Sequence, residues 1–317
     1  MTAARVWSMV FSLTLLSNSI LFAAETPENE EPVLPPVPMV GSWTFSGMVS
    51  NESGDRYGYF FQVQRQGIDF HTKTALIDGQ TNKLVLFYEG DEKIMMPTQL
   101  NWHVGRSFIR YNPINDSWVF GMKSADNKGF NFKVDMLKQT RKDNEIIELR
   151  PGVEMQALQT SSLNGHIAMG DVEEQFVTGN NAWFGKLWVS KDQKKAHDVS
   201  TTFCRLSNEN GFYSANMKEA DATRAAVAGW RDAAGNHVKM SQFISIKPLE
   251  NDQCQLHVGL PKVNLKLLNS LSLTQLDLPK DTSTTKKQLS IAGFSKENPK
   301  GFCFVAEQSL KQLEQLG

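Results

Sequence analysis

Hydrophobic and polar residues alternate with a period of two through most of the chain beyond residue 40. Between residues 43 and 63 the odd positions are mostly large or apolar, and Asn51–Asp55 supplies turn-forming residues between two alternating halves. This pattern predicts a β-hairpin whose aromatic side chains share one face. Those side chains belong to Trp43, Phe45, Tyr57, Tyr59 and Phe61.

Short alternating segments of the same kind recur along the chain, which predicts an all-β fold of barrels or sandwiches. They lie at residues 84–88, 130–136, 238–246 and 302–304. Helical spacing is limited to two segments, a short helix expected over Lys218–Arg231 and a terminal helix over residues 309–316. About 280 residues follow residue 40, which favours two barrels in tandem over one.

The N-terminus has the pattern of a cleaved signal peptide covering residues 1–24. Arg5 precedes an apolar stretch over Val6–Phe22, and Ala23 and Ala24 supply small residues for cleavage. The stretch is shorter and more polar than a membrane span of about 20 apolar residues requires. Residues 25–39 are rich in Pro and Glu, so we expect an extended or disordered tether. A secreted or periplasmic location follows.

The charge balance excludes the electrostatic signature of a nucleic-acid-binding protein, because 33 Lys and Arg face 34 Asp and Glu. None of the six His residues pairs with another at a close metal-ligand spacing, so we expect neither a metal nor a cofactor. The three cysteines are Cys204, Cys254 and Cys303. This number is compatible with one disulfide and one free cysteine, and equally with three free cysteines.

Several motifs together resemble the hydroxyneurosporene synthase (carotenoid hydratase)/AttH-like family. Their order and spacing match the family from about residue 40 to residue 308. They are Trp43–Val49, Arg56–Phe61 with Arg65, His71–Asp78, Ser162–His166, Val177–Phe184, Leu289–Gly293 and Gly301–Glu307. The resemblance implies two tandem lipocalin-like barrels with an apolar ligand cavity in or between them. It places the first barrel at residues 40–176 and the second at residues 177–317.

The chain departs from the family where the family's chemistry is expected. The mid-chain motif that usually carries an Asp and a His between two tryptophans has Gly185 and Lys186 at those positions. Hydration of an alkene needs a proton donor and a base beside the double bond. Gly185 can be neither, and Lys186 is a poor acid at neutral pH. The family's hydratase activity is therefore not carried over, and an enzymatic role is disfavoured.

Three functions stay open on this evidence. The first is an exported protein that binds or carries an apolar small molecule of the lipid or isoprenoid class in an aromatic-lined cavity. Its expected binding residues are the five hairpin aromatics with Trp183, Lys186, Trp188 and Trp230, where Lys186 would hold a carboxylate or phosphate group. Transient contact with a membrane surface would accompany this role, and the oligomeric state stays open.

The second function is a lyase or isomerase acting on an apolar substrate. Its polar groups would come from Arg65, His71, Asp78 or His166. The third is a structural or interaction protein of the cell envelope, whose barrels would be filled by their own side chains.

Overall fold

A computed structural model describes most of the chain beyond residue 36. The described residues are 37–97, 99–136, 146–170, 172–191, 197–206, 210–219, 222–232, 236–240, 244–248, 254–258, 263–272, 290–295 and 301–310. The predicted signal peptide and most of the predicted tether lie outside them. Every regular element among these residues is a β-strand, which confirms the predicted all-β class. These residues include no helix long and apolar enough to cross a membrane.

The first sheet contains thirteen strands from the N-terminal part of the chain. They are β1 (Val40–Asn51), β2 (Arg56–Gln66), β3 (Asp69–Asp78), β4 (Leu84–Lys93), β5 (Asn101–Val104), β6 (Ser107–Asn112), β7 (Ser117–Lys123), β8 (Lys128–Asp135), β9 (Ile147–Arg150), β10 (Val153–Gln159), β11 (Ser162–Met169), β12 (Gln175–Gly179) and β13 (Trp183–Val189). The long path through this sheet runs β4-β3-β2-β1-β12-β11-β8-β7-β6-β5.

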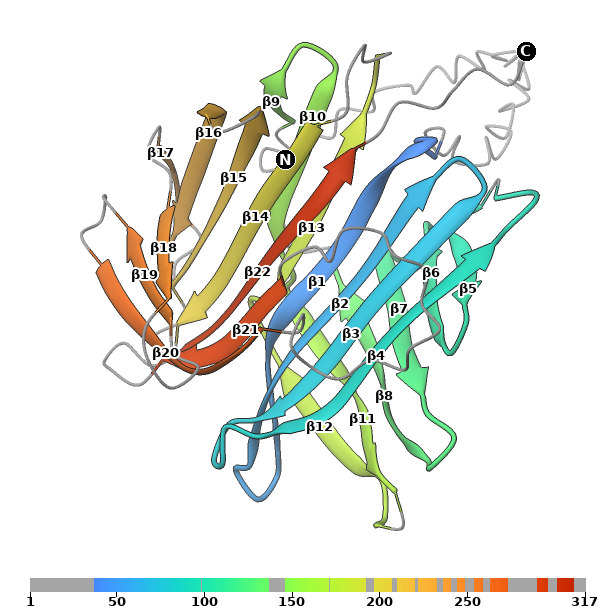
Figure 1. The fold of residues 1–317 in the computed structure, drawn as a ribbon. Helices are drawn as coiled ribbons and strands as arrows, with labels where there is room; N and C mark the ends of the chain where they lie inside the picture. The colour runs from blue at the N-terminus through green and yellow to red at the C-terminus, as the bar shows by residue number, and fades with distance from the viewer. Residues whose placement is uncertain are drawn as a thin grey trace, which may run out of the picture. The chain divides into compact units, whose positions relative to one another are not determined.

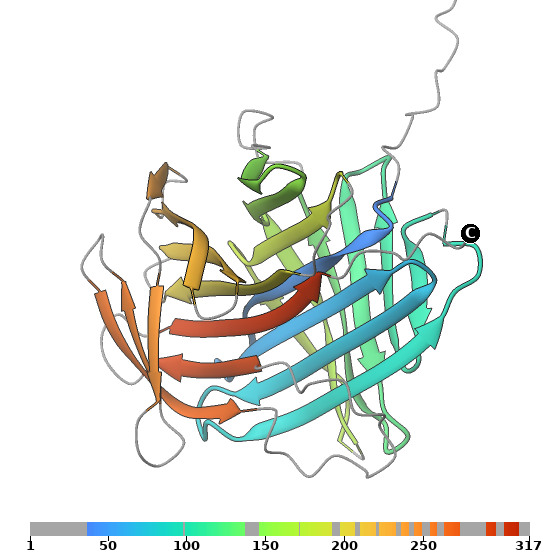
Figure 2. The ribbon, with the colours of Figure 1, turned by 45° about the horizontal axis from the view of Figure 1, so that its top comes forward.

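This path curves round until its two ends meet, which makes a nearly closed barrel (Figures 1 and 2). At the seam, the hydroxyl of Tyr88 on β4 accepts a hydrogen bond of 2.9 Å from the backbone N–H of Arg106, which follows β5. Strand β1 branches, because its C-terminal end pairs with β12 and its N-terminal half pairs with β13. Strands β10 and β9 extend the sheet beyond β13.

The second sheet contains nine strands in the order β17-β16-β15-β14-β22-β21-β20-β19-β18. They are β14 (His197–Leu206), β15 (Gly211–Glu219), β16 (Ala222–Arg231), β17 (His237–Met240), β18 (Ile244–Pro248), β19 (Cys254–Val258), β20 (Val263–Ser272), β21 (Ser290–Ser295) and β22 (Gly301–Leu310). A disulfide joins Cys204 on β14 to Cys303 on β22, where the two residues face each other across the ladder. The pairing that the sequence left open is thereby assigned.

Two lipocalin-like sheets in tandem match the predicted architecture. The hydrogen-bonded sheet changes after Val189, since β12 and β13 both pair with β1. The strands that open the predicted second barrel at residue 177 are therefore bonded to the first sheet. The division of the chain into domains at residues 176 and 177 itself stays a prediction.

Apolar side chains line the inside of the first barrel and also pack in the layer between the two sheets. The barrel interior is one large cluster of buried residues drawn from β1 to β13. Two further clusters join residues of both sheets, one around Trp183 and Phe203 and the other around Phe60 and Phe304. In the latter, the rings of Phe60 and Phe304 stack with centroids 4.1 Å apart.

The expected helix over Lys218–Arg231 is wrong, because this segment ends β15 and forms β16. Its register pairs Gly211 with Arg231 across an antiparallel ladder. Gly229, which interrupts the helical pattern, has a role in the sheet, since a Cβ atom there would overlap the ring of Tyr213 on the neighbouring strand. Packing between strands thus outweighs local helix propensity. Ser309, the first residue of the expected terminal helix, lies in β22, and residues 311–316 lie outside the described residues.

Candidate functional site

The five hairpin aromatics all lie on the inner face of the first barrel, as their alternation predicted. Each belongs to the barrel's buried cluster. Phe45 stacks on Phe120 with ring centroids 4.2 Å apart, and Tyr59 meets the edge of Phe132 at 5.0 Å. The middle of the barrel is therefore occupied to a large extent by the protein's own rings.

A second aromatic group lies toward the end of the barrel where β1, β3 and β5 begin. Trp102 meets Trp43 and Phe70 edge-on, with centroids 4.8 Å apart in both pairs. The guanidinium of Arg65 lies 5.7 Å from the centre of the Phe70 ring and donates to the backbone carbonyls of Gly67 and Val37. Arg65 thus holds the backbone at this end, and the structure gives it no direct part in proton transfer.

Five buried polar atoms inside the first barrel have no hydrogen-bond partner among the described residues. They are Trp43 Nε1, Tyr59 Oη, Thr74 Oγ1, Trp102 Nε1 and Ser107 Oγ. Buried polar groups in native proteins are almost always hydrogen-bonded, to protein or to a bound molecule. Burial also raises the pKa of Tyr59 far above its ordinary value, so its hydroxyl stays protonated and available as a donor.

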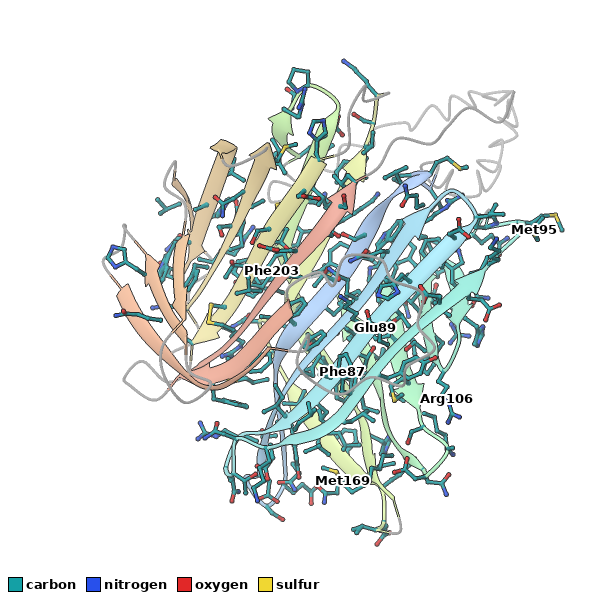
Figure 3. The ribbon with its side chains drawn as sticks, in the orientation of Figure 1. Phe87, Glu89, Met95, Arg106, Met169 and Phe203 are labelled. Atoms are coloured by element: carbon teal, nitrogen blue, oxygen red, sulfur yellow. A yellow bond between two sulfur atoms is a disulfide. The ribbon has the colours of Figure 1, made fainter. Side chains whose placement is uncertain are left out.

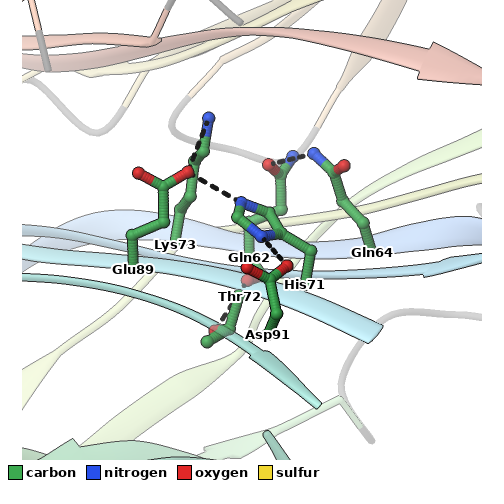
Figure 4. A network of polar contacts seen from close by, with 7 residues as sticks. All are labelled: Gln62, Gln64, His71, Thr72, Lys73, Glu89 and Asp91. Carbon is green, nitrogen blue, oxygen red and sulfur yellow. Dashed lines mark hydrogen bonds and ion pairs between the residues drawn. The ribbon is translucent and has the colours of Figure 1, made fainter. Parts of the chain in front are cut away.

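A ladder of polar side chains crosses the outer face of the same barrel. One row runs Thr44–Gln62–Lys73–Glu89 over β1 to β4, and the next row pairs Gln64 with His71 and His71 with Asp91. We call these seven residues the polar ladder. Figure 4 shows six of them, Gln62, Gln64, His71, Lys73, Glu89 and Asp91, projecting from the sheet on the same side.

The polar ladder is held together by charge at its β3–β4 end. His71 lies between two carboxylates, with Nε2 2.8 Å from Glu89 Oε1 and Nδ1 2.7 Å from Asp91 Oδ1. Lys73 Nζ lies 3.4 Å from the same Glu89 oxygen. At the other end the amide of Gln62 donates to Thr44 Oγ1 at 3.0 Å.

The surroundings shift the pKa values of these groups toward their charged forms. Burial alone would lower the pKa of His71, but hydrogen bonds and charge from Asp91 and Glu89 outweigh it and raise that pKa. Burial would raise the pKa of Glu89, yet His71 and Lys73 bring it below its ordinary value. The hydrogen bond with His71 lowers the pKa of Asp91 in the same way. All three shifts favour an imidazolium held between two carboxylates.

The polar ladder borders the apolar layer between the sheets. Phe60 and Ala75 occupy the next row of the same face, and both belong to the apolar cluster in which Phe60 stacks on Phe304 of β22. On the facing sheet, Thr201 Oγ1 and Gln308 Oε1 are buried without a partner among the described residues. This layer therefore combines titratable groups with an aromatic wall.

The predicted binding residues of the second half do not form one site. Trp183 donates from Nε1 to the carbonyl of Cys204 at 2.7 Å and packs between the sheets. Lys186, three residues later, lies on the opposite face of β13, with Nζ 4.7 Å from the ring centre of Trp188. Burial lowers the pKa of Lys186. Trp230 stacks on Phe212 in the second sheet, apart from the other three.

Gly185, the first of the two mid-chain positions where the sequence departs from the motif it resembles, faces Phe203 across the layer between the sheets. A Cβ atom at Gly185 would lie 2.9 Å from Cε2 of that ring and closer still to Cζ (Figure 3 labels Phe203). The ring thus occupies the space that a side chain at position 185 would need. Position 185 therefore contributes to the packing between the sheets and offers no side chain for acid–base chemistry.

The remaining sequence candidates have structural explanations. The Asp78 carboxylate accepts hydrogen bonds from the backbone of Gln80 and the hydroxyl of Thr81, so it shapes the turn after β3. His166 is exposed and meets the ring of Phe176 edge-on. Among the described residues, no group of three or more His, Cys, Asp or Glu is placed to hold a metal ion.

The sequence analysis did not identify most of the polar residues of the barrel interior and of the polar ladder. The inner polar atoms of Thr74, Trp102 and Ser107 went unnoticed because their strands are short or weakly alternating. Glu89 and Asp91 carried a usable signal, since they alternate along a strand that forms a hairpin with His71 and Lys73. Pairing residues 69–78 with residues 84–93 as the two strands of an antiparallel hairpin would have placed His71 opposite Asp91.

Comparison with solved structures gives the same fold. A protein of Nitrosomonas europaea described as an AttH matches with a TM-score of 0.59 and 13% identity, over 86% of this chain and 93% of that one. Kievitone hydratase from Nectria haematococca matches with a TM-score of 0.58 and 13% identity, over 90% of this chain and 94% of that one. No protein-family model and no curated protein sequence matches. The chain shares the fold of these two proteins, and this fold is lipocalin-like, as the motif resemblance predicted.

Proposed function

We propose that the protein binds an apolar small molecule inside its first barrel. The observation that carries this proposal is the set of five unpartnered polar atoms in an otherwise aromatic interior. Ligand pockets are typically apolar, with a few polar groups that fix the orientation of the ligand. Two of the five atoms are indole N–H groups, which can only donate. The bound molecule should therefore carry at least one acceptor oxygen, such as a hydroxyl, carbonyl or ether.

The position of the donors suggests which part of the barrel the ligand occupies. The middle of the barrel is packed with rings, whereas Trp43 and Trp102 lie toward the end where β1 and β5 begin. An isoprenoid alcohol or a lipid with a short polar group would fit this arrangement, with its oxygen near the two indoles. Burial of its apolar part would supply most of the affinity, at about 25 cal/mol per Å². Export to the periplasm or beyond is part of this proposal.

Titration with retinol, a fluorescent isoprenoid alcohol, tests the proposal. Replacing Trp102 with Phe keeps a ring but removes the N–H group. This change should weaken retinol binding about three- to tenfold, the effect of one hydrogen bond. Trp230→Phe is the matched control, because Trp230 lies in the second sheet. If both variants bind retinol equally well, the Trp102 indole does not donate to the ligand. If the wild-type protein does not bind retinol, the proposed ligand class of isoprenoid alcohols is wrong.

The polar ladder supports a second candidate function, a lyase or isomerase. A protonated imidazole beside a carboxylate can give and take a proton, and such perturbed groups are frequent at active sites. His71 would transfer the proton while Glu89 holds the imidazole and Lys73 balances its charge. The aromatic row beside the ladder would hold an apolar substrate.

Exchange of deuterium from D₂O into a copurified ligand would separate the two functions. A mass increase that is lost in His71→Gln and kept in His166→Gln would establish proton transfer at the polar ladder. Ligand that stays unlabelled in the presence of the wild-type protein would leave binding as the function.

A further inference from the structure

Exposed apolar side chains gather at one end of the first barrel. Because neighbouring strands are antiparallel, the residues before β1, the β2–β3 turn, the β4–β5 connection and the β6–β7 turn all lie at the same end. Backbone hydrogen bonds join three of these segments, from Gly67 to Met39 at 2.7 Å and from Ile94 to Ile68 at 2.9 Å. We call the exposed apolar residues of this end the apolar rim. It consists of Met39, Ile68, Met95, Met96 and Ile114.

The apolar rim is unusual in its degree of exposure. Met95, Met96 and Ile114 expose 74%, 83% and 89% of their surface, and Met39 and Ile68 are also exposed. Single exposed apolar residues are normal, but a group of them at one place marks an interaction site. These five belong to nine large exposed apolar residues in the described part of the chain. Figure 3 shows Met95 projecting away from the strands.

Three features of this end suit a lipid bilayer as the partner. The apolar side chains come from the tips of separate turns, and flexible methionines adapt to irregular apolar surroundings. The apolar stretch over Val6–Phe22 is joined to Met39 by sixteen residues, a reach of at most about 55 Å. Until the predicted signal peptide is cleaved, Met39 therefore stays within about 55 Å of the membrane that this stretch enters during export.

The third feature is the position of the rim relative to the barrel interior. Trp43 and Trp102 lie toward the same end, because they stand near the starts of β1 and β5. The charged residues beside the rim are mostly acidic, with Asp69, Glu92 and Asp116 against Lys93, so these segments carry no excess of positive charge. An apolar contact with a zwitterionic surface fits this composition better than attraction to anionic lipid.

We propose that the apolar rim docks on the surface of a zwitterionic lipid bilayer. Apolar side chains at the tips of the turns enter the boundary between headgroups and acyl chains, and the barrel stays in water. Docking would place the end of the barrel that holds the indole donors at the source of an apolar molecule. The proposal concerns the surface alone and stands whether or not the barrel binds a ligand.

Co-sedimentation with phosphatidylcholine vesicles tests this proposal on protein purified from an exporting host. The rim variant is Met95→Ser/Met96→Ser. The matched control is Val172→Ser/Phe176→Ser, which removes two exposed apolar side chains from the β11–β12 end of the same barrel. Circular dichroism and urea unfolding establish that all three proteins are folded alike.

The rim variant should partition onto the vesicles at least about tenfold less than the wild type, since the apolar area that enters the lipid is reduced. The control variant should match the wild type, and added salt should change neither result. Equal partition of the rim variant and the wild type would overturn the proposal. Binding that requires phosphatidylglycerol and disappears in salt would overturn it too, in favour of an electrostatic contact. No ligand enters this assay, so its outcome is independent of the proposed function.

Discussion

Replacing Gly185 with alanine should destabilise the protein through a clash with Phe203. The new Cβ atom would lie 2.9 Å from Cε2 and 3.1 Å from Cε1 of the Phe203 ring, and nearer still to Cζ. The ring has little room to move away, because it is buried and packs beside Trp183 in the layer between the sheets. The two sheets or the ring must therefore shift.

The expected magnitude follows from two opposing effects. Overpacking a well-packed core typically lowers the free energy of unfolding by about 1–3 kcal/mol. Replacing glycine with alanine inside a strand raises it by roughly 0.5–1 kcal/mol, so the loss outweighs the gain. We therefore expect Gly185→Ala to lower the free energy of unfolding by about 1–2 kcal/mol. In a Phe203→Leu background the ring atoms that cause the clash are absent, so the same change should be neutral or slightly stabilising.

Urea unfolding of the four proteins of this double-mutant cycle, followed by circular dichroism, measures the coupling between the two positions. We expect a coupling energy of about 1–3 kcal/mol, larger than the value for independent sites. Additive effects, or a stabilising Gly185→Ala in the wild-type background, would refute the explanation that the Phe203 ring fills the space beside Gly185.

Three further predictions concern the interior, the polar ladder and the disulfide. Tyr59→Phe should leave the free energy of unfolding unchanged or raise it by about 1 kcal/mol, because it removes a buried hydroxyl without a partner. A lower free energy of unfolding in urea would show that the hydroxyl is hydrogen-bonded. The raised pKa of His71 means that its stabilisation is complete below its ordinary value of 6.5 and is lost as pH rises through the folded value. The destabilisation caused by His71→Gln should therefore shrink between pH 5.5 and pH 9, and a constant difference would contradict the ion pairs. Reducing the Cys204–Cys303 disulfide, which spans 99 residues, should cost about 2–5 kcal/mol and lower the thermal midpoint; an unchanged midpoint would refute its structural role.

The sequence predicted the strands best where large side chains alternate strictly. The segment from Trp43 to Val63 is one hairpin, with its aromatics turned inward, because a period of two leaves the chain no other way to bury them. The strand over Ala222–Arg231 was missed because alanine and glycine give little alternation, and the reason for Gly229 is the Tyr213 ring of the neighbouring strand.

The candidate sites were harder to predict because they depend on contacts between distant segments. The indole of Trp102 meets Trp43 only because the strands of the first sheet curve round until β5 lies near β1 and β4. The partners of Gly185 and Phe60 lie in the second sheet, and no local pattern specifies which faces of two sheets will meet. Which buried polar atoms lack a hydrogen-bond partner likewise depends on the folded barrel and cannot be derived from amino-acid composition.

The central claim is that the first barrel holds an apolar molecule, and native mass spectrometry tests it most directly. Protein purified gently from an exporting host should carry an additional mass, which organic extraction releases as an apolar compound with at least one oxygen. Trp102→Phe should reduce the occupied fraction, and Trp230→Phe should leave it unchanged. A wild-type protein that shows only its bare mass, and takes up neither retinol nor fatty acids, would contradict the claim and identify the barrel as filled by its own side chains.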